Sequence, residues 1–131
     1  MKKFKVGEYV ICEDQIGRVT AGSVPDDHYY WIEVDGVMQV ARDVQKLNIR
    51  FKPFEINRNL QVYETRVIKG YEYPIQFMST DDNFAAFSYC KKGTMFGTMG
   101  CKPCVTRDQA RDWLELQYAT LIAKARGLSG E

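Results

Sequence analysis

The sequence predicts a mainly β protein with an α+β second half: a small five-stranded barrel is followed by an antiparallel meander of three to four strands packed on one C-terminal helix. Short β-branched and aromatic runs separated by turn residues fill most of the chain, and a helical apolar pattern begins only after residue 105. At 131 residues, with 45% apolar and 27% charged residues, the chain has the composition of an ordinary globular protein. We expect a barrel at 1–50, a connector at 51–59 and a second domain at 60–131.

The first fifty residues contain a series of short strand-like runs. Asp35-Gly36 lies between two of them and is a strong hairpin signal, because both residues of such a turn adopt positive φ. Residues 42–47 have the pattern of a short helical turn. Five short strands in about fifty residues cannot make an open sheet with two buried faces, so they are better closed into a small barrel. The expected strands cover residues 8–12, 17–22, 29–34, 37–41 and 47–51.

Four quoted stretches of this segment carry a family resemblance. They are "FKVGEYV", "IGRVTAG", "YYWIEVDG" and "RDVQKL". Together they resemble the Tudor/KOW class of small barrels, with its Gly-acidic-x-Val entry, its Gly-x-Val second strand and its closing short helix. The resemblance covers residues 4–49, about a third of the chain. It implies a binding function, because barrels of this class usually bind protein tails or nucleic acid and are seldom enzymes.

Further strand-like runs after the connector predict the meander. Lys69-Gly70 is a two-residue turn with glycine, and residues 80–83 and 91–93 are polar turns. We therefore expect antiparallel neighbours joined by short connections. The expected strands cover residues 60–68, 71–79, 84–90 and 94–99.

One helix is expected after the meander. Thr106 and Gln109 match a Thr-x-x-Gln capping box, and Gly127 is placed to end the helix. An apolar stripe at helical spacing would face the sheet, and it consists of Ala110, Trp113, Leu114, Tyr118, Leu121 and Ala125. The sheet and helix at 60–126 resemble, in layout, HicB-like antitoxins and the small DNA-reading domains of integrases. Because the helix is longer than the strands, its last turns would meet either the barrel or a second copy in a homodimer.

Three of the four cysteines lie in "CKKGTMFGTMGCKPC", which raises metal and redox alternatives. Cys101 and Cys104 form a Cys-x2-Cys pair, and a zinc site would add Cys90 with either Cys12 or His28. Cys-x-Pro-Cys also occurs in thioredoxin-like folds, but those need further strands after the motif. We favour the plain interpretation, without metal or cofactor, in which Cys90 is a small strand residue and "GCKPC" is the bend into the helix.

No pattern of a catalytic site is found in the sequence. His28 is the only histidine and lies in the polar loop "PDDHYY", while Asp81 and Asp82 occupy another turn. The glycines of "GTMFGTMG" precede an extended bend and not a helix, which argues against a phosphate-binding loop. Nothing assembles a nucleophile, a base and an orienting group, so we expect no enzymatic activity and no catalytic residues.

An aromatic and cationic ledge is the candidate binding surface of the first part. Alternate residues of a strand face opposite sides, so inward-pointing Tyr30, Ile32 and Val34 would turn their neighbours outward. The ledge would stack bases, hold a methylammonium group or dock a peptide, unless the second domain covers it. Its expected members are Tyr9, Arg18, Tyr29 and Trp31.

A basic hairpin is the candidate surface of the second part. Lys91-Lys92-Gly93 is expected at its tip, and the sheet face away from the helix would add cations. The expected members are Arg66, Lys91, Lys92 and Lys102.

Charge and hydropathy limit the partners. Eighteen Lys and Arg against seventeen Asp and Glu give a net charge of +1, so bulk charge does not indicate a polyanion ligand. No run approaches the ~18 apolar residues of a membrane span, and Gly7 and Glu8 interrupt the basic start, so we expect a cytoplasmic protein without a membrane partner. We predict a non-enzymatic binding protein for nucleic acid or protein. The open alternatives are a phage or mobile-element accessory protein that occludes a host system or sequesters a nucleotide, and a zinc-stabilised interaction module.

Overall fold

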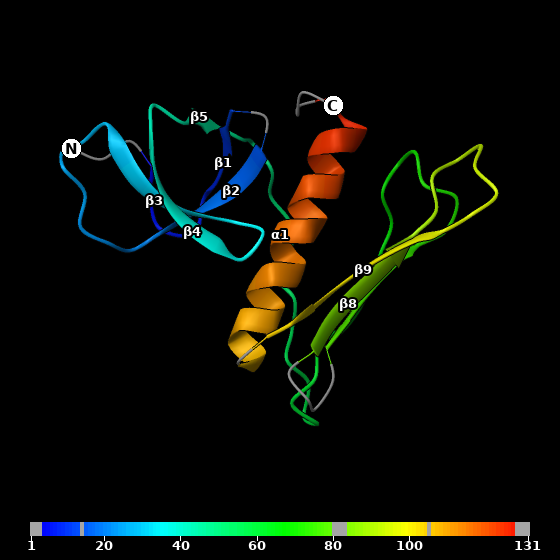
Figure 1. Cartoon of the computed structure of the whole chain (residues 1–131). Helices are drawn as coiled ribbons and strands as arrows, with labels where there is room; N and C mark the ends of the chain where they lie inside the picture. The colour runs from blue at the N-terminus through cyan, green and yellow to red at the C-terminus, as the bar shows by residue number, and fades with distance from the viewer. Residues whose placement is uncertain (1–3, 14, 80–83, 105, 128–131) are drawn as a thin grey trace. The chain divides into compact units, whose positions relative to one another are not determined.

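The computed structural model describes residues 4–13, 15–79, 84–104 and 106–127. Within these residues the chain forms two antiparallel sheets, of five and four strands, and one C-terminal helix, which confirms the expected fold class (Figure 1). The residues divide into two compact units. The first unit is Met1–Arg50 with Ala119–Glu131, and the second is Phe51–Tyr118. The turn expected at 80–83 lies outside the described residues.

The first unit contains the five-stranded sheet. Its strands are β1 (Tyr9–Cys12), β2 (Gln15–Thr20), β3 (Tyr29–Val34), β4 (Val37–Arg42) and β5 (Gln45–Lys46). They pair in the order β4-β3-β2-β1-β5, so β4 and β5 are the two ends of this sheet. Asp35 and Gly36 join β3 to β4 with φ of 52° and 82°, as the hairpin signal predicts.

One face of this sheet packs into an apolar core. The cluster of buried side chains consists of Phe4, Val10, Val19, Tyr30, Ile32, Ala41 and Val44. Phe4 and Tyr30 place their ring centroids 5.3 Å apart. Val34 packs against the same cluster, so the expected inward direction of alternate β3 residues is confirmed.

Residues 42–47 do not form the expected helical turn. Asp43 bends the chain with a φ of 56°, and the residues after Val44 pair with β1 as β5. Val44 and Leu47, on either side of β5, are both buried. β5 also replaces the strand expected at 47–51. Pairing with a strand distant in sequence outweighs the local helical pattern here, because tertiary context overrides weak helix propensity.

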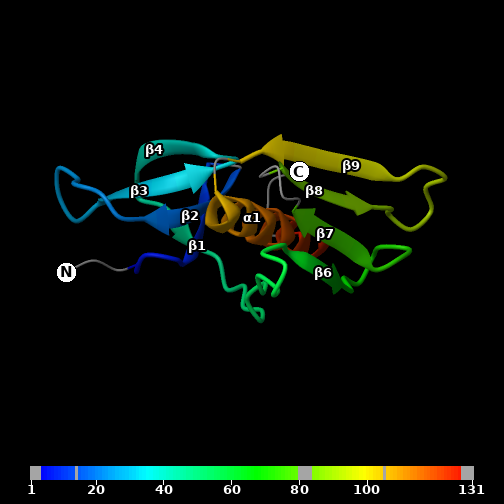
Figure 2. The same ribbon diagram turned by 90° about the horizontal axis from the view of Figure 1, so that it is seen from below.

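The second unit contains the four-stranded meander. Its strands are β6 (Tyr63–Arg66), β7 (Ile75–Ser79), β8 (Phe84–Tyr89) and β9 (Thr98–Pro103), in the order β6-β7-β8-β9 (Figure 2). The helix α1 (Arg107–Ala125) packs against one face of this sheet through its first turns. The ring centroids of Phe77 and Tyr118 lie 5.4 Å apart, and those of Phe87 and Trp113 lie 5.7 Å apart.

The expected limits of α1 are confirmed. Gln109 N donates to Thr106 Oγ1 at 3.1 Å, which caps the first turn. Gly127 follows the last turn with a φ of 67°, and its N–H donates to Lys124 O at 3.1 Å. Leu121 and Ile122, in the last turns of α1, are buried within the single chain.

The last strand lies later in the chain than expected. The predictions of a strand at 94–99 and of a bend at 100–104 are wrong, because Thr98–Pro103 pair with β8 along their full length. Residues 90–97 form a loop instead of a tight turn. Gly100 permits the strand, since a Cβ there would lie 2.6 Å from the ring of Phe87 on the neighbouring strand.

A buried carboxylate ties the segment before β6 to α1. Phe54 N donates to Glu115 Oε2 at 2.8 Å, and both residues are buried. The Phe54 ring stacks on Tyr118 with centroids 5.6 Å apart and lies 5.0 Å from the ring of Phe77. The guanidinium of Arg66 lies 4.7 Å over the Phe54 ring. This cluster therefore joins the connector, the sheet and the helix of the second unit.

We expect Glu115→Ala to reduce the free energy of unfolding by about 1–3 kcal/mol, because it leaves the buried Phe54 N–H without its acceptor. Glu115→Gln retains an oxygen acceptor and should cost clearly less. Urea denaturation followed by circular dichroism measures both variants. A stability of Glu115→Ala equal to that of the wild type would contradict the prediction.

Candidate functional site

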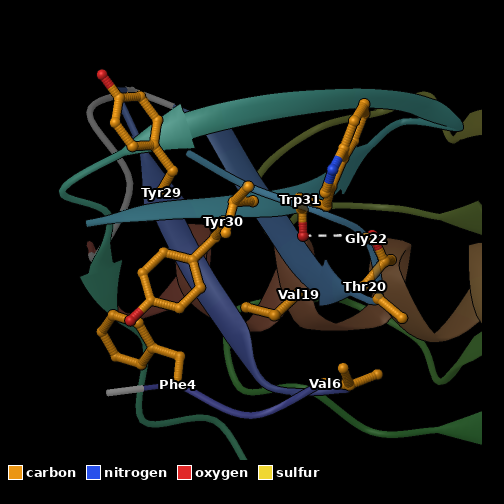
Figure 3. Close-up of a pocket in the computed structure, with 10 residues that line it drawn as sticks. Phe4, Val6, Val19, Thr20, Gly22, Tyr29, Tyr30 and Trp31 are labelled. Carbon is orange, nitrogen blue, oxygen red and sulfur yellow. Dashed lines mark hydrogen bonds between the residues drawn. The ribbon is translucent and has the colours of Figure 1, made fainter. Parts of the chain in front are cut away.

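A pocket of about 170 Å³ opens beside the first residues of β3 (Figure 3). None of the ten described side chains that line it is charged. They are Phe4, Val6, Val19, Thr20, Ala21, Gly22, Val24, Tyr29, Tyr30 and Trp31. An engineered apolar cavity of about 150 Å³ holds a benzene molecule, so this pocket has the size for one ring or one branched aliphatic group.

The pocket is built by residues before β1, by the end of β2 with the residues that follow it, and by the start of β3. Figure 3 shows the neighbouring rings of Phe4 and Tyr30 at one side and Trp31 at the other, with Val19 between them. Val6 lines the pocket while 67% of its surface stays exposed. The alternation of β3 explains why Tyr30 joins the core cluster while Trp31 lies on the opposite side of the strand.

The polar groups of the Trp31 region are bonded within the protein. Thr20 Oγ1 donates to Trp31 O at 3.2 Å, and Trp31 Nε1 donates to Ser23 O at 2.7 Å. Gly22 lies directly against the indole, because a Cβ on this residue would overlap the Cδ1 atom of Trp31. The hydrogen bond and the packing of the indole thus hold residues 21–24 against β3. Because these polar groups are already bonded, a ligand would contact mainly apolar surface.

The four residues of the expected ledge separate into two pairs. Tyr9 is buried, and the guanidinium of Arg18 lies 5.5 Å over its ring. Tyr29 and Trp31 are half-buried and both line the pocket. The guanidinium of Arg42 lies 5.8 Å over the Tyr29 ring. The structure therefore brings Tyr29 and Trp31 to one site and places Arg18 on Tyr9.

Sequence reasoning missed the pocket residues that precede β1 and those that follow β2. Phe4 and Val6 come from the first group, and Gly22 and Val24 come from the second. The pairing of β2 with β3 indicates where the missed residues after β2 lie. Thr20 pairs with Trp31, so the residues that follow Thr20 pass beside the indole.

The cations expected on the second unit do not gather in one place. The Nη2 atom of Arg66 lies 2.6 Å from Glu64 Oε1, and both side chains are mostly buried. Lys91 and Lys92 lie in the loop after β8. Lys102 lies on β9, four residues or about 13 Å along the strand from its start. Of these four residues, Lys91 and Lys92 lie in the same loop.

The thiols occupy different environments. Cys101 is exposed on β9, and Cys90 and Cys104 are half-buried. Burial, and secondarily the charge of Glu13, raises the pKa of the Cys12 thiol. In the described ranges, no three side chains of His, Cys, Asp or Glu lie close enough to share a metal ion.

The remaining polar candidates are exposed or outside the described residues. His28 Nδ1 lies 3.6 Å from Asp43 Oδ1, and both side chains are mostly exposed. Asp81 and Asp82 belong to the segment that the structure does not describe. In the part of the chain that is described, no helix has the length and apolar character needed to cross a membrane.

We expect Gly22→Ala to displace the Trp31 indole, because the added methyl group overlaps Cδ1. Overpacking of this kind costs about 1–3 kcal/mol of stability. The indole N–H resonance of Trp31 should move as its bond to Ser23 O is lost, and urea denaturation should show the destabilisation. Gly97→Ala is the matched control, since its Cβ would lie 3.4 Å from Tyr89 O in ordinary contact. An unchanged indole resonance in Gly22→Ala would contradict the geometry.

We expect Cys12 to react more slowly than Cys101 with iodoacetamide at pH 8. Its raised pKa leaves less thiolate, and its side chain is less exposed than that of Cys101. Peptide mass spectrometry at successive times gives the two rates in one sample. Equal rates would show that burial does not protect Cys12.

Comparisons with known proteins assign no family to this chain. No protein-family model matches the sequence, and searches of curated proteins and of solved structures give no significant match. The Tudor/KOW resemblance stays a prediction from the sequence.

Proposed function

We propose that this chain is a non-enzymatic binding protein whose first unit holds one apolar side chain of a partner protein in the pocket beside β3. The uncharged lining of this pocket carries the proposal. The hydroxyl of Thr20 and the indole N–H of Trp31 are already bonded within the protein. A partner side chain would therefore gain free energy mainly by leaving water, at about 25 cal/mol per Å² of apolar surface buried.

The neighbouring cations favour a protein partner over nucleic acid. The guanidinium groups of Arg18 and Arg42 lie over the rings of Tyr9 and Tyr29. The Arg42 Nε atom also lies 3.2 Å from Asp43 Oδ2. Nucleic-acid binding by such a surface uses cations directed at phosphates and open ring faces for the bases. Here the cations and rings contact each other.

Peptide selection tests the proposal, because it does not require the partner to be identified. A displayed library of random peptides, selected on the wild-type chain, should enrich sequences that share one aromatic or branched aliphatic residue. Val6→Glu places a carboxylate beside the apolar pocket and should lower the affinity for these peptides at least about tenfold, because a bound peptide would cover the carboxylate and burying an unpaired charge is costly. Since Val6 is 67% exposed, the variant should fold normally. Isothermal titration calorimetry measures the affinities.

Val37→Glu is the matched control for this experiment. Val37 is 64% exposed, lies in the first unit and does not line the pocket, so its variant should bind the peptides as the wild type does. Equal affinities of the two variants would remove the pocket from the proposal. Oligonucleotide binding that weakens with salt and is lost in Val6→Glu would replace the protein partner with nucleic acid.

A further inference from the structure

Two turns of the second unit meet at one end of the sheet and form a second exposed surface. This surface, the hairpin end, consists of residues 67–74 and 90–97. Met95 is 91% exposed and Phe96 is 82% exposed, and Val67 and Tyr73 are also largely exposed. Single exposed apolar residues are ordinary, but several large ones on neighbouring turns mark a contact site.

Internal hydrogen bonds fix the loop that carries Met95 and Phe96. Thr94 Oγ1 donates to Lys91 O at 2.6 Å, and Thr94 N donates to the same oxygen at 3.2 Å. The Sγ atom of Cys90 lies 3.8 Å from the carbonyl oxygens of Thr94 and Phe96. The two apolar side chains are thus presented by an ordered backbone, which lowers the entropy lost on binding.

Further backbone bonds attach this loop to the turn between β6 and β7. Lys92 N donates to Gly70 O at 3.1 Å, and Glu72 N donates to Cys90 O at 2.7 Å. A hollow of about 310 Å³ lies at this junction, with Tyr73, Tyr89 and Met95 among its lining residues. Its size is at the lower end of ligand pockets, so it accepts one side chain and part of a peptide backbone.

The charge of the hairpin end is positive. Lys69, Lys91 and Lys92 are exposed, and none of their ammonium groups has an ion-pair partner among the residues that the structure describes. Glu72 is the one carboxylate in residues 67–74 and 90–97, which leaves three cations against one anion. A partner with carboxylates around an apolar residue would match this charge.

We infer that the hairpin end docks an acidic segment of a partner protein that inserts one apolar side chain beside Met95 and Phe96. Three lysines are fewer than the roughly six to ten phosphate contacts of a typical duplex-binding protein. They are also fewer than the roughly four to eight cations of a typical anionic-lipid site. The hollow of about 310 Å³ adds a recess that one side chain can enter. This inference does not depend on the pocket of the first unit.

A synthetic peptide of acidic residues around one central phenylalanine tests the inference on the full chain. With methionine methyl groups labelled for NMR, the peptide should shift the Met95 signal, and its affinity should fall several-fold when salt is raised from about 50 to about 300 mM. A peptide with serine in place of phenylalanine and a peptide with lysine in place of the acidic residues should each bind at least about tenfold more weakly. Absence of binding by the acidic peptide at millimolar concentration overturns the inference.

Three variants locate the site. Phe96→Glu should lower the affinity for the acidic peptide at least about tenfold. It adds a charge of the same sign as the peptide and removes an apolar contact. Thr94→Val keeps Met95 and Phe96 but removes the hydroxyl bond to Lys91 O, so it should lower the affinity by a smaller factor. Met38→Glu, at an exposed position of the first unit, is the control and should bind normally. Thermal unfolding of each variant checks the fold.

Two other classes of ligand are tested for binding to the chain in the same experiment. Vesicles that contain phosphatidylserine and a short DNA duplex should both bind more weakly than the acidic peptide. Tighter binding to the vesicles, lost in Phe96→Glu, would overturn the inference in favour of a lipid surface. Tighter binding to the duplex would overturn it in favour of nucleic acid.

Discussion

The packing of Phe77 holds the second unit together. Its side chain is fully buried, and its ring lies 5.0 Å from Phe54, 5.9 Å from Phe87 and 5.4 Å from Tyr118. These neighbours come from the segment before β6, from β8 and from α1, so one ring connects every layer of the unit. A sheet of short strands needs such an apolar face to be stable. Phe87, one of these neighbours, pairs with Gly100, so the same packing reaches β9.

At both candidate surfaces, a side-chain hydrogen bond to the backbone orders a loop. At the pocket, the Trp31 indole holds residues 21–24 against β3 through its bond to Ser23 O. At the hairpin end, the Thr94 hydroxyl holds the loop through its bond to Lys91 O. In both cases a side chain bonded to the backbone orders a connection that contains glycine. The first hydrogen bond orders residues that line the pocket, whereas the second orders a loop from which Met95 and Phe96 protrude.

Sequence reasoning succeeded where the local pattern and the tertiary structure agree. The alternation of Tyr30 and Ile32 in β3 and the cap at Thr106 each depend on a few neighbouring residues, and both are as expected. It failed where contacts that the local pattern does not reveal decide the structure. Gln45–Lys46 form a strand only because β1 lies beside them, and β9 begins at Thr98 because the preceding residues bond among themselves. The sequence predicted an exposed ledge and no pocket; two of the expected ledge residues, Tyr29 and Trp31, line the pocket together with Phe4 and Val6.

The division of the chain into units has a consequence for its synthesis on the ribosome. Residues 51–118 make a unit from one continuous segment, whereas residues 1–50 share a unit with residues 119–131. At about 5–20 residues per second, residues 51–131 take roughly 4–16 s to be made. The second unit is complete before that interval ends. The core cluster of the first unit lies within residues 4–44 and is already translated when that interval begins, whereas residues 119–131, which belong to the same unit, are translated last.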